Sequence, residues 1–180
     1  MKLSNIIIAV AATVLATSCG SKKDPQYIIV EPEKPAVKKQ TTIASEPYKM
    51  EDNISWFGSM YKYRVVRESD KEAPTVKNED GQKFFDNKAT VTVWRADGSE
   101  FYSHTFKKES FSQYLPSLFN KNGILEGLVF EKAEKDYLQF AASVALPQTD
   151  EYMPFAIRIS TSGNITIVKV NEMEEAQEIE

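Results

Sequence analysis

The stretch Ala89-Thr-Val-Thr-Val-Trp-Arg-Ala-Asp-Gly-Ser-Glu-Phe-Tyr-Ser-His-Thr-Phe106 decides the fold class. Two runs of alternating apolar and polar residues flank Asp97-Gly98, a dipeptide typical of a two-residue β-hairpin turn. Counting outward from this turn, the predicted register pairs Trp94 with Phe101 on the weaker, more polar face of the hairpin. The chain is therefore predicted to contain antiparallel strands.

The same register places His104 opposite Val91, on the more apolar face of the hairpin. A Ser-His nucleophile pair needs a hydroxyl group within hydrogen-bond reach and a third group that orients the imidazole. Ser103 is the neighbour of His104 but points to the opposite face, and the sequence has no Gly-x-Ser-x-Gly elbow. We therefore predict that His104 is a half-buried structural residue.

Further strands are predicted before and after this hairpin. They cover Tyr61–Val66, a hairpin of Leu128–Glu131 with Tyr137–Leu146, and a third hairpin of Phe155–Ser160 with Ile165–Val170. Each run combines apolar alternation with turn residues at its end. The predicted fold class is mainly β (α+β), an antiparallel meander that forms a sandwich or an open barrel with one covering helix.

The covering helix is predicted from one apolar stripe with helical spacing. The stripe consists of Phe111, Tyr114, Leu115, Leu118 and Phe119. Ser110-Phe-Ser-Gln113 fits a capping box at its start, and Gly123 follows its end. Pro116 lies inside the stripe and must kink or split the helix, because its ring clashes with the preceding turn.

The N-terminus predicts export and lipid attachment. Lys2 precedes the 10-residue apolar run Ile6–Leu15, which is too short to span a membrane, a task that takes roughly 20 residues. Residues 1–18 are therefore predicted to be a signal peptide. Leu15-Ala-Thr-Ser-Cys19-Gly20 resembles a bacterial lipobox, in which cleavage before Cys19 lets its sulfur and new α-amine carry acyl chains. Ordinary cleavage that leaves a free thiol is the alternative.

Composition divides the exported chain into three parts. Residues 19–53 hold four of the eight prolines and many charges, and they are predicted to form the lipidated cysteine and a flexible tether. Within them Tyr27–Val30 is a β-prone run that either docks as an edge strand or stays in the linker. Residues 54–171 hold 18 of the 20 aromatic side chains and are predicted to be one β-rich domain, and residues 172–180 an acidic disordered tail.

Overall charge and residue counts exclude several classes of protein. The 180 residues carry 22 Lys+Arg and 26 Asp+Glu, a net charge of −4, which argues against a nucleic-acid partner. One Cys and one His exclude an intramolecular disulfide framework and a multi-cysteine or multi-histidine metal site. No phosphate-binding Gly-rich loop is present, so we expect no cofactor.

Acidic residues leave one catalytic alternative open. Asp70, Asp86 and Glu126 are candidates for the carboxylate pair that glycoside hydrolysis requires, although no spacing signature links them. Asn78-Glu-Asp-Gly81 is similar to part of a calcium loop, but the positions of the first and last ligands hold Val76 and Asn87. We therefore interpret it as a glycine turn between strands.

Aromatic residues supply a second candidate site. Trp56, Trp94 and Phe101, together with Phe57, are predicted either to pack in the core or to form a stacking platform for a sugar or an apolar ligand. The exposure of Trp94 in the structure distinguishes these hypotheses, because a core residue is buried and a ligand platform is exposed.

Four runs resemble a family of lipoproteins of unknown function from Bacteroidetes. They are Tyr61-Lys-Tyr-Arg-Val-Val-Arg-Glu-Ser-Asp-Lys-Glu-Ala-Pro74, Phe85-Asp-Asn87, Ala96-Asp-Gly-Ser99 and Gly127-Leu-Val-Phe130, and the resemblance covers about Trp56 to Val170. It implies a Gram-negative envelope lipoprotein and transfers no functional residue. Surface export in that phylum is associated with acidic residues soon after the lipidated cysteine, whereas this chain has Gly20-Ser-Lys-Lys-Asp24. The periplasmic face of the outer membrane is therefore expected.

Taken together, these patterns predict a non-catalytic, lipid-anchored envelope protein. Its acyl chains on Cys19 would bind the membrane, and its β-rich domain would bind an unknown envelope protein or a small ligand. The alternatives are an envelope hydrolase that acts on glycans through a carboxylate pair and a lipocalin-like carrier with an internal cavity of at least ~300 Å³ for an apolar ligand.

Overall fold

The computed structural model describes residues 41–170. The predicted signal peptide, the candidate lipidation residue Cys19, the Tyr27–Val30 run and the acidic tail lie outside the described residues. No helix in residues 41–170 has the length and apolarity needed to cross a membrane.

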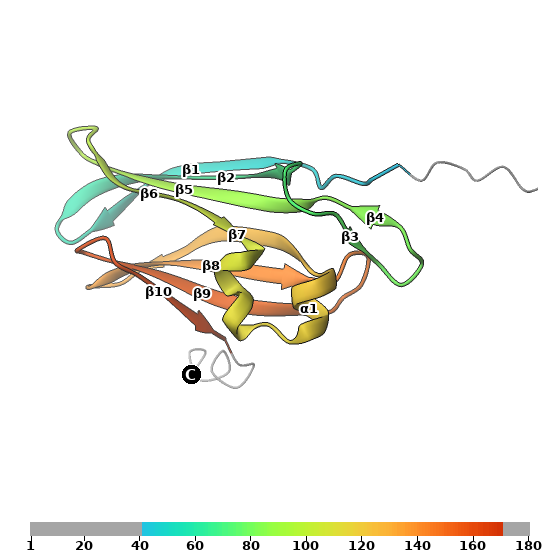
Figure 1. Cartoon of the computed structure of the whole chain (residues 1–180). Helices are drawn as coiled ribbons and strands as arrows, with labels where there is room; N and C mark the ends of the chain where they lie inside the picture. The colour runs from blue at the N-terminus through green and yellow to red at the C-terminus, as the bar shows by residue number, and fades with distance from the viewer. Residues whose placement is uncertain (1–40, 171–180) are drawn as a thin grey trace, which may run out of the picture. The chain divides into compact units, whose positions relative to one another are not determined.

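Two antiparallel four-stranded sheets form the two layers of the fold (Figure 1). The first sheet has the order β1-β2-β5-β6 and contains β1 (Tyr48–Trp56), β2 (Ser59–Asp70), β5 (Asp86–Arg95) and β6 (Glu100–Lys107). The second has the order β10-β9-β8-β7 and contains β7 (Ile124–Ala133), β8 (Tyr137–Ala145), β9 (Tyr152–Ser160) and β10 (Ile165–Lys169). Neither sheet closes on itself. The predicted mainly β fold is therefore confirmed, as a sandwich.

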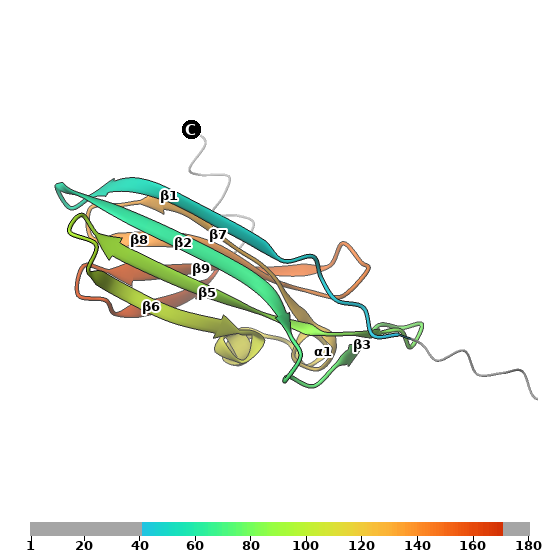
Figure 2. The ribbon, with the colours of Figure 1, turned by 90° about the horizontal axis from the view of Figure 1, so that it is seen from above.

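A small hairpin and the second of two short helices lie toward one end of the sandwich, and the first short helix lies beside the end of β6 (Figure 2). The hairpin consists of β3 (Val76–Lys77) and β4 (Lys83–Phe84), and Ile43 adds a parallel bridge beside Phe84. The other end carries the turns of the four hairpins β1–β2, β5–β6, β7–β8 and β9–β10.

The core lies between the two sheets and is filled by aromatic and branched side chains. Its largest fully buried members are Phe106, Phe111, Phe140, Phe155, Leu125, Leu128, Leu138, Ile157, Ile159, Val65, Val91 and Val93. They come from both sheets and from the first short helix, and at roughly 1.5–3 kcal/mol each their burial is the main stabilising contribution. Successive side chains of a strand point to opposite faces of the sheet, so the alternation of apolar and polar residues places the apolar strand residues on the inner face.

Strand β1 corrects the predicted domain boundary. Its residues 48–53 fall within the stretch that composition assigned to the flexible tether, so the ordered domain begins before residue 54. Tyr48 and Trp56 face the core, and the Tyr48 hydroxyl donates to Leu128 O at 2.7 Å and accepts from Leu128 N at 2.8 Å. Composition alone did not indicate a strand here, because the charged residues of β1 lie on the solvent face of an edge strand and raise the average polarity of the segment.

The decisive hairpin forms at Asp97-Gly98, but its predicted register is correct only in part. Val91 lies opposite His104 as predicted. A register shift after Val93 pairs Trp94 with Glu100, so the predicted pairing of Trp94 with Phe101 is wrong. The extra residue at this β-bulge turns Phe101 toward the core, because a bulge interrupts the alternation of side chains.

The predicted helix is split at Pro116, as expected for proline inside a helical pattern. A 3-10 helix, η1 (Lys108–Tyr114), precedes the proline, and α1 (Ser117–Asn122) follows it and ends before Gly123. The predicted cap at Ser110 is wrong because the helix begins earlier, and Ser110 instead accepts a hydrogen bond from Lys107 N at 3.2 Å. Leu118, a member of the predicted stripe, is exposed.

The remaining hairpins form as predicted, although β7 and β9 begin earlier than predicted and β8 and β10 each end one residue sooner. The β7–β8 and β9–β10 pairs match the second and third predicted hairpins. Asn78–Gly81 forms the turn of the β3–β4 hairpin, with Gly81 at a φ of +79° and its N–H donating to Asn78 O at 3.0 Å. This confirms the interpretation of that run as a glycine turn.

Candidate functional site

Trp56, the first member of the predicted aromatic platform, belongs to the core. It is 3% exposed, and its ring makes edge contacts with Tyr61 at 5.1 Å and with Phe101 at 5.6 Å between centroids. Its indole N–H donates to Glu134 O at 2.8 Å, which ties β1 to the end of β7. Trp56 is therefore a packing residue that joins the two sheets.

Trp94 lies apart from the other two aromatic residues. It is half-buried on the outer face of the first sheet, where the Arg64 guanidinium lies 4.9 Å from its ring centroid. Phe101 packs on the inner side with Trp56. Because the bulge separates Trp94 from Phe101, the three predicted residues do not form one surface.

The outer face around Trp94 is dominated by charge. Glu51 contacts Lys62, Arg64 at 2.7 Å and Lys49 at 3.1 Å. Hydrogen bonds from these three cations lower the pKa of Glu51 to about 2, from an ordinary value of 4.5. This face is therefore a polar, solvated surface.

His104 is more exposed than predicted. Its ring makes an edge contact with Phe106 at 4.7 Å, on a strand at the edge of the first sheet. The hydroxyl of Ser103 lies 3.4 Å from that of Thr92 on the other face of the strand, so Ser103 and His104 point to opposite faces as predicted. His104 lines a shallow groove between β6 and β10, to which η1 contributes Tyr114.

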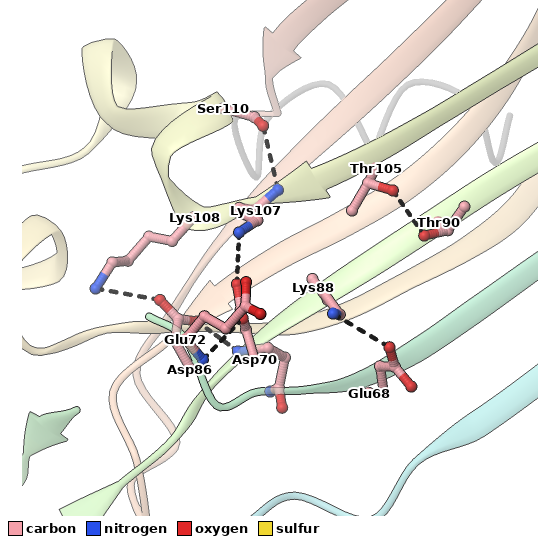
Figure 3. Close-up of polar contacts among 11 residues, drawn as sticks. Glu68, Asp70, Glu72, Asp86, Lys88, Thr90, Thr105, Lys107, Lys108 and Ser110 are labelled. Atoms are coloured by element: carbon pink, nitrogen blue, oxygen red, sulfur yellow. Dashed lines mark hydrogen bonds and ion pairs between the residues drawn. The ribbon is translucent and has the colours of Figure 1, made fainter. Parts of the chain in front are cut away.

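The structure brings two of the candidate carboxylates together. Asp70 and Asp86 are directly opposite each other at the ends of β2 and β5. They are 1% and 3% exposed, and each is paired with one of two consecutive lysines (Figure 3). Lys107 Nζ lies 2.7 Å from Asp70 Oδ2, and Lys108 Nζ lies 3.4 Å from Asp86 Oδ2. Glu126, the third candidate, is exposed on β7.

Backbone N–H groups occupy the remaining carboxylate oxygens. Asp86 Oδ1 accepts from Asn87 N at 2.8 Å and from Leu125 N at 2.9 Å, and Asp70 Oδ1 accepts from Glu72 N at 3.2 Å. Lys108 Nζ also donates to Gly123 O at 2.8 Å. The four residues Asp70, Asp86, Lys107 and Lys108, named the buried charge cluster below, thus join β2, β5 and β7 to the segment where β6 becomes η1.

The two aspartates differ in their electrostatics. Burial raises the pKa of Asp86, against the opposing effects of the Leu125 and Asn87 N–H groups and of Lys108. The hydrogen bond from Lys107 lowers the pKa of Asp70, and Asp70 in turn raises the pKa of Lys107. Two neighbouring carboxyl groups whose pKa values are shifted in opposite directions can serve as a general acid and a general base. Here, however, both carboxylates are buried, and each of their four oxygens has a backbone N–H group or a lysine ammonium group beside it.

These contacts favour a structural role for the buried charge cluster. A glycosidase pair flanks a cleft that admits the substrate and a water molecule. The two aspartates instead hold strand ends and a helix start in place. Sequence reasoning named both acids but missed Lys107 and Lys108, since two consecutive lysines after a strand normally indicate a solvated surface. Within residues 41–170 no group of three or more His, Cys, Asp or Glu is placed to hold a metal ion.

With the fold and these contacts established, comparison with known proteins assigns a family. The model of a domain of unknown function, DUF4738, matches residues 29–167, which is more than three quarters of the chain. The chain belongs to the DUF4738 family. No curated protein matches it. The DUF4738 match begins before β1 and ends within β10, so it includes both sheets and the buried charge cluster.

Proposed function

We propose that this DUF4738 protein is a lipid-anchored component of a bacterial cell envelope, whose β-sandwich binds another envelope protein or a small ligand without catalysing a reaction. The observation that carries the proposal is the lone cysteine at the end of an apolar export signal. Cys19 follows Leu15-Ala-Thr-Ser18, and small side chains before a cysteine suit the protease that prepares lipoproteins. Two or more acyl chains then hold the product stably on a membrane.

The described domain supports binding more than hydrolysis. Asp70 and Asp86 form the only cross-strand pair among the three candidate acids, and their oxygens are occupied by Lys107, Lys108 and backbone N–H groups. The carrier alternative depends on a closed barrel, whereas residues 41–170 form an open sandwich with a filled core. Both alternatives therefore lose support from the geometry.

The spacer between the proposed anchor and the domain sets how far the domain extends from the membrane. Residues 20–40 separate Cys19 from the first described residue, Thr41. A flexible chain of this length has a root-mean-square reach of roughly 25 Å. We place the domain at the periplasmic face of the outer membrane, because Gly20-Ser-Lys-Lys-Asp24 lacks an early run of acidic residues.

Acyl labelling of the full chain tests the anchor. Cells that express the wild type with an alkyne-tagged fatty acid should yield a labelled protein in the membrane fraction. Cys19→Ala should abolish the label and leave the unprocessed precursor. Ser18→Ala is the matched control, because it keeps a small residue beside the cleavage site and should retain the label. A normally labelled Cys19→Ala protein would refute the proposal.

Protease treatment of intact cells tests the membrane face. The domain should resist an added protease in intact cells and become cleavable after the outer membrane is permeabilised. Cleavage in intact cells would contradict the periplasmic placement while leaving the lipid anchor itself intact as a proposal.

A further inference from the structure

Strand β10 is the least protected edge of the sandwich. It pairs with β9 on one side without any register shift, and the described residues place no strand on its other side. Its sequence, Ile165-Thr-Ile-Val-Lys169, is mostly β-branched, and Ile165 is 38% exposed. Sheet edges are usually protected by bulges, prolines or charges, because unprotected edges pair readily with another chain. In the five-residue strand β10 the one charged side chain, Lys169, stands at the end of the strand.

The other three edges are protected by features of the described residues. Strand β7 contains two bulges and faces β1, whose Tyr48 hydroxyl bonds to the β7 backbone. Strand β1 carries the charged group around Glu51. Strand β6 contains the bulge at Phe101 and leads directly into η1. Among the four edges of the described sheets, only β10 combines a regular backbone with an exposed apolar side chain, that of Ile165.

Hydrogen bonds to β9 reveal which β10 backbone groups point outward. Ser160 N donates to Asn164 O at 2.9 Å, and Val170 N donates to Pro154 O at 3.2 Å. The backbone N–H and C=O groups of the even-numbered residues in 164–170 therefore point toward β9, because the hydrogen-bonding direction of the backbone alternates from residue to residue along an antiparallel strand. The N–H and C=O groups of Ile165, Ile167 and Lys169 consequently point away from the sheet, where the described residues supply them with no hydrogen-bond partner.

We propose that β10 is a self-association site at which a second copy of this chain adds its own β10 in antiparallel orientation. A two-fold axis through Ile167 uses all outward backbone groups of both copies. It pairs Ile167 with itself and Ile165 with Lys169 of the second copy, so about six backbone hydrogen bonds form. No like charges lie opposite each other in this register, because Lys169 faces an isoleucine.

The groove beside β10 adds an apolar contact to the backbone pairing. It is lined by Phe106 and His104 on one side and by Ile165 and Ile167 on the other, and η1 contributes Tyr114. The polar side chains of Ser110, Gln113 and Thr166 also line it. Ile165 and Ile167 lie on the strand face that adjoins this groove, so the added strand extends the apolar row. Association therefore removes Ile165 from water and covers the edge.

Self-association through one strand is expected to be weak in dilute solution. A single added strand buries less than the roughly 1,200–2,000 Å² of a stable interface. Confinement on a membrane raises the effective concentration of the two copies. This last step rests on the proposed lipid anchor, whereas the pairing itself depends only on β10.

Sedimentation equilibrium of the full chain in mild detergent tests the site and its register. Wild type should show a concentration-dependent dimer. Ile165→Lys places a lysine opposite Lys169 at both ends of the interface and should weaken the dimer about tenfold, whereas Ile165→Glu places a carboxylate there and should retain it. Val129→Lys is the matched control on another strand, because Val129 is 37% exposed, and it should leave the dimer unchanged.

A backbone variant tests the hydrogen bonds separately. Lys169→Pro removes one outward N–H group at an exposed position without touching the β9 ladder, and it should abolish the dimer. Lys169→Ala, which keeps the N–H group, should preserve it. A wild-type chain that stays monomeric up to about 1 mM, or equal effects of Ile165→Lys and Val129→Lys, would overturn the proposal. The same experiment with Cys19→Ala should still show the dimer, so this result is independent of acylation.

Discussion

Replacing Lys108 by methionine tests whether the buried charge cluster stabilises the fold. The substitution keeps an unbranched side chain of similar length but removes the ammonium group. Lys108 Nζ contacts Asp86 Oδ2 at 3.4 Å and Gly123 O at 2.8 Å, and the side chains of Lys108 and Asp86 are only 10% and 4% exposed. Methionine leaves the Asp86 carboxylate buried without its cation and Gly123 O without its donor.

The expected cost follows from these contacts. Removing one partner of a buried ion pair costs about 3–5 kcal/mol, because the remaining charge is left in a poorly solvated place. Asp86 keeps two backbone N–H donors, to its Oδ1 atom, so we expect the lower end, about 3 kcal/mol at pH 7. Domains of this size unfold with about 5–15 kcal/mol in total, so the loss should be large.

Urea denaturation followed by tryptophan fluorescence measures the change. The urea midpoint should fall by about 1–3 M, since the slope for a small domain is typically about 1–3 kcal/mol per M. The double variant Asp86→Asn/Lys108→Met should recover part of the loss, because the asparagine amide retains an oxygen for both backbone donors and carries no charge. Lys88→Met removes an exposed pair with Glu68 and should cost about 0–1 kcal/mol.

The pH dependence of Lys108→Met has a definite sign. Burial already raises the pKa of Asp86, and loss of the cation raises it further. The buried, unpaired Asp86 carboxylate therefore destabilises the variant fully above the folded-state pKa of Asp86. This loss of stability decreases as the pH falls through that pKa, because the carboxyl group then binds a proton and becomes neutral. A loss below about 1 kcal/mol at pH 7, or a double variant whose loss equals the sum of the single losses, would refute this reasoning.

Three further predictions concern other parts of the domain, each measured by urea denaturation. The pKa of Asp70 is lowered from its ordinary value of 3.8, mainly by the hydrogen bond from Lys107. The ionised carboxylate therefore stabilises the fold above pH 3.8, and this stabilisation is lost as the pH falls through the folded-state pKa. Asp70→Asn should remove this pH-dependent contribution to the free energy of unfolding. Gly123→Ala should cost about 1–3 kcal/mol, because the new Cβ would lie 2.6 Å from Phe119 O. Phe57→Asn should stabilise the domain by about 0.5–1 kcal/mol, because Phe57 has a φ of +49° and is exposed, and asparagine tolerates this conformation better.

Each of these has an outcome that contradicts it. Acid sensitivity below about pH 4 that is unchanged in Asp70→Asn would assign that stability to other groups. Gly127→Ala is the control for Gly123, because the nearest atom to its new Cβ lies 3.5 Å away; equal losses in both variants would exclude the steric explanation. A Phe57→Asn protein that is less stable than wild type would show that the exposed ring contributes more than the strain costs.

Local patterns in the sequence were sufficient for most strands and for the split helix. Asp97-Gly98 marks a hairpin because few other residues adopt the required turn, and Pro116 interrupts a helix wherever it occurs inside one. The bulge at Phe101 had no such local signal. It moves Phe101 to the core beside Trp56 and Tyr61, a packing preference between three strands that no single strand encodes.

The sequence by itself determined seven of the strands in their order along the chain and three of the hairpins that join them, because each depends on residues close together in the chain. The export signal and its cysteine stay predictions from the same kind of local pattern. Tertiary structure alone decided that β1 belongs to the domain, that Trp94 is separated from Trp56, and that Asp70 and Asp86 meet Lys107 and Lys108 inside the protein. These features depend on contacts between distant segments. Sequence patterns assign a charged residue to the solvated surface, because its buried partner lies on a distant segment of the chain. Only the packing of the two sheets brings such partners together.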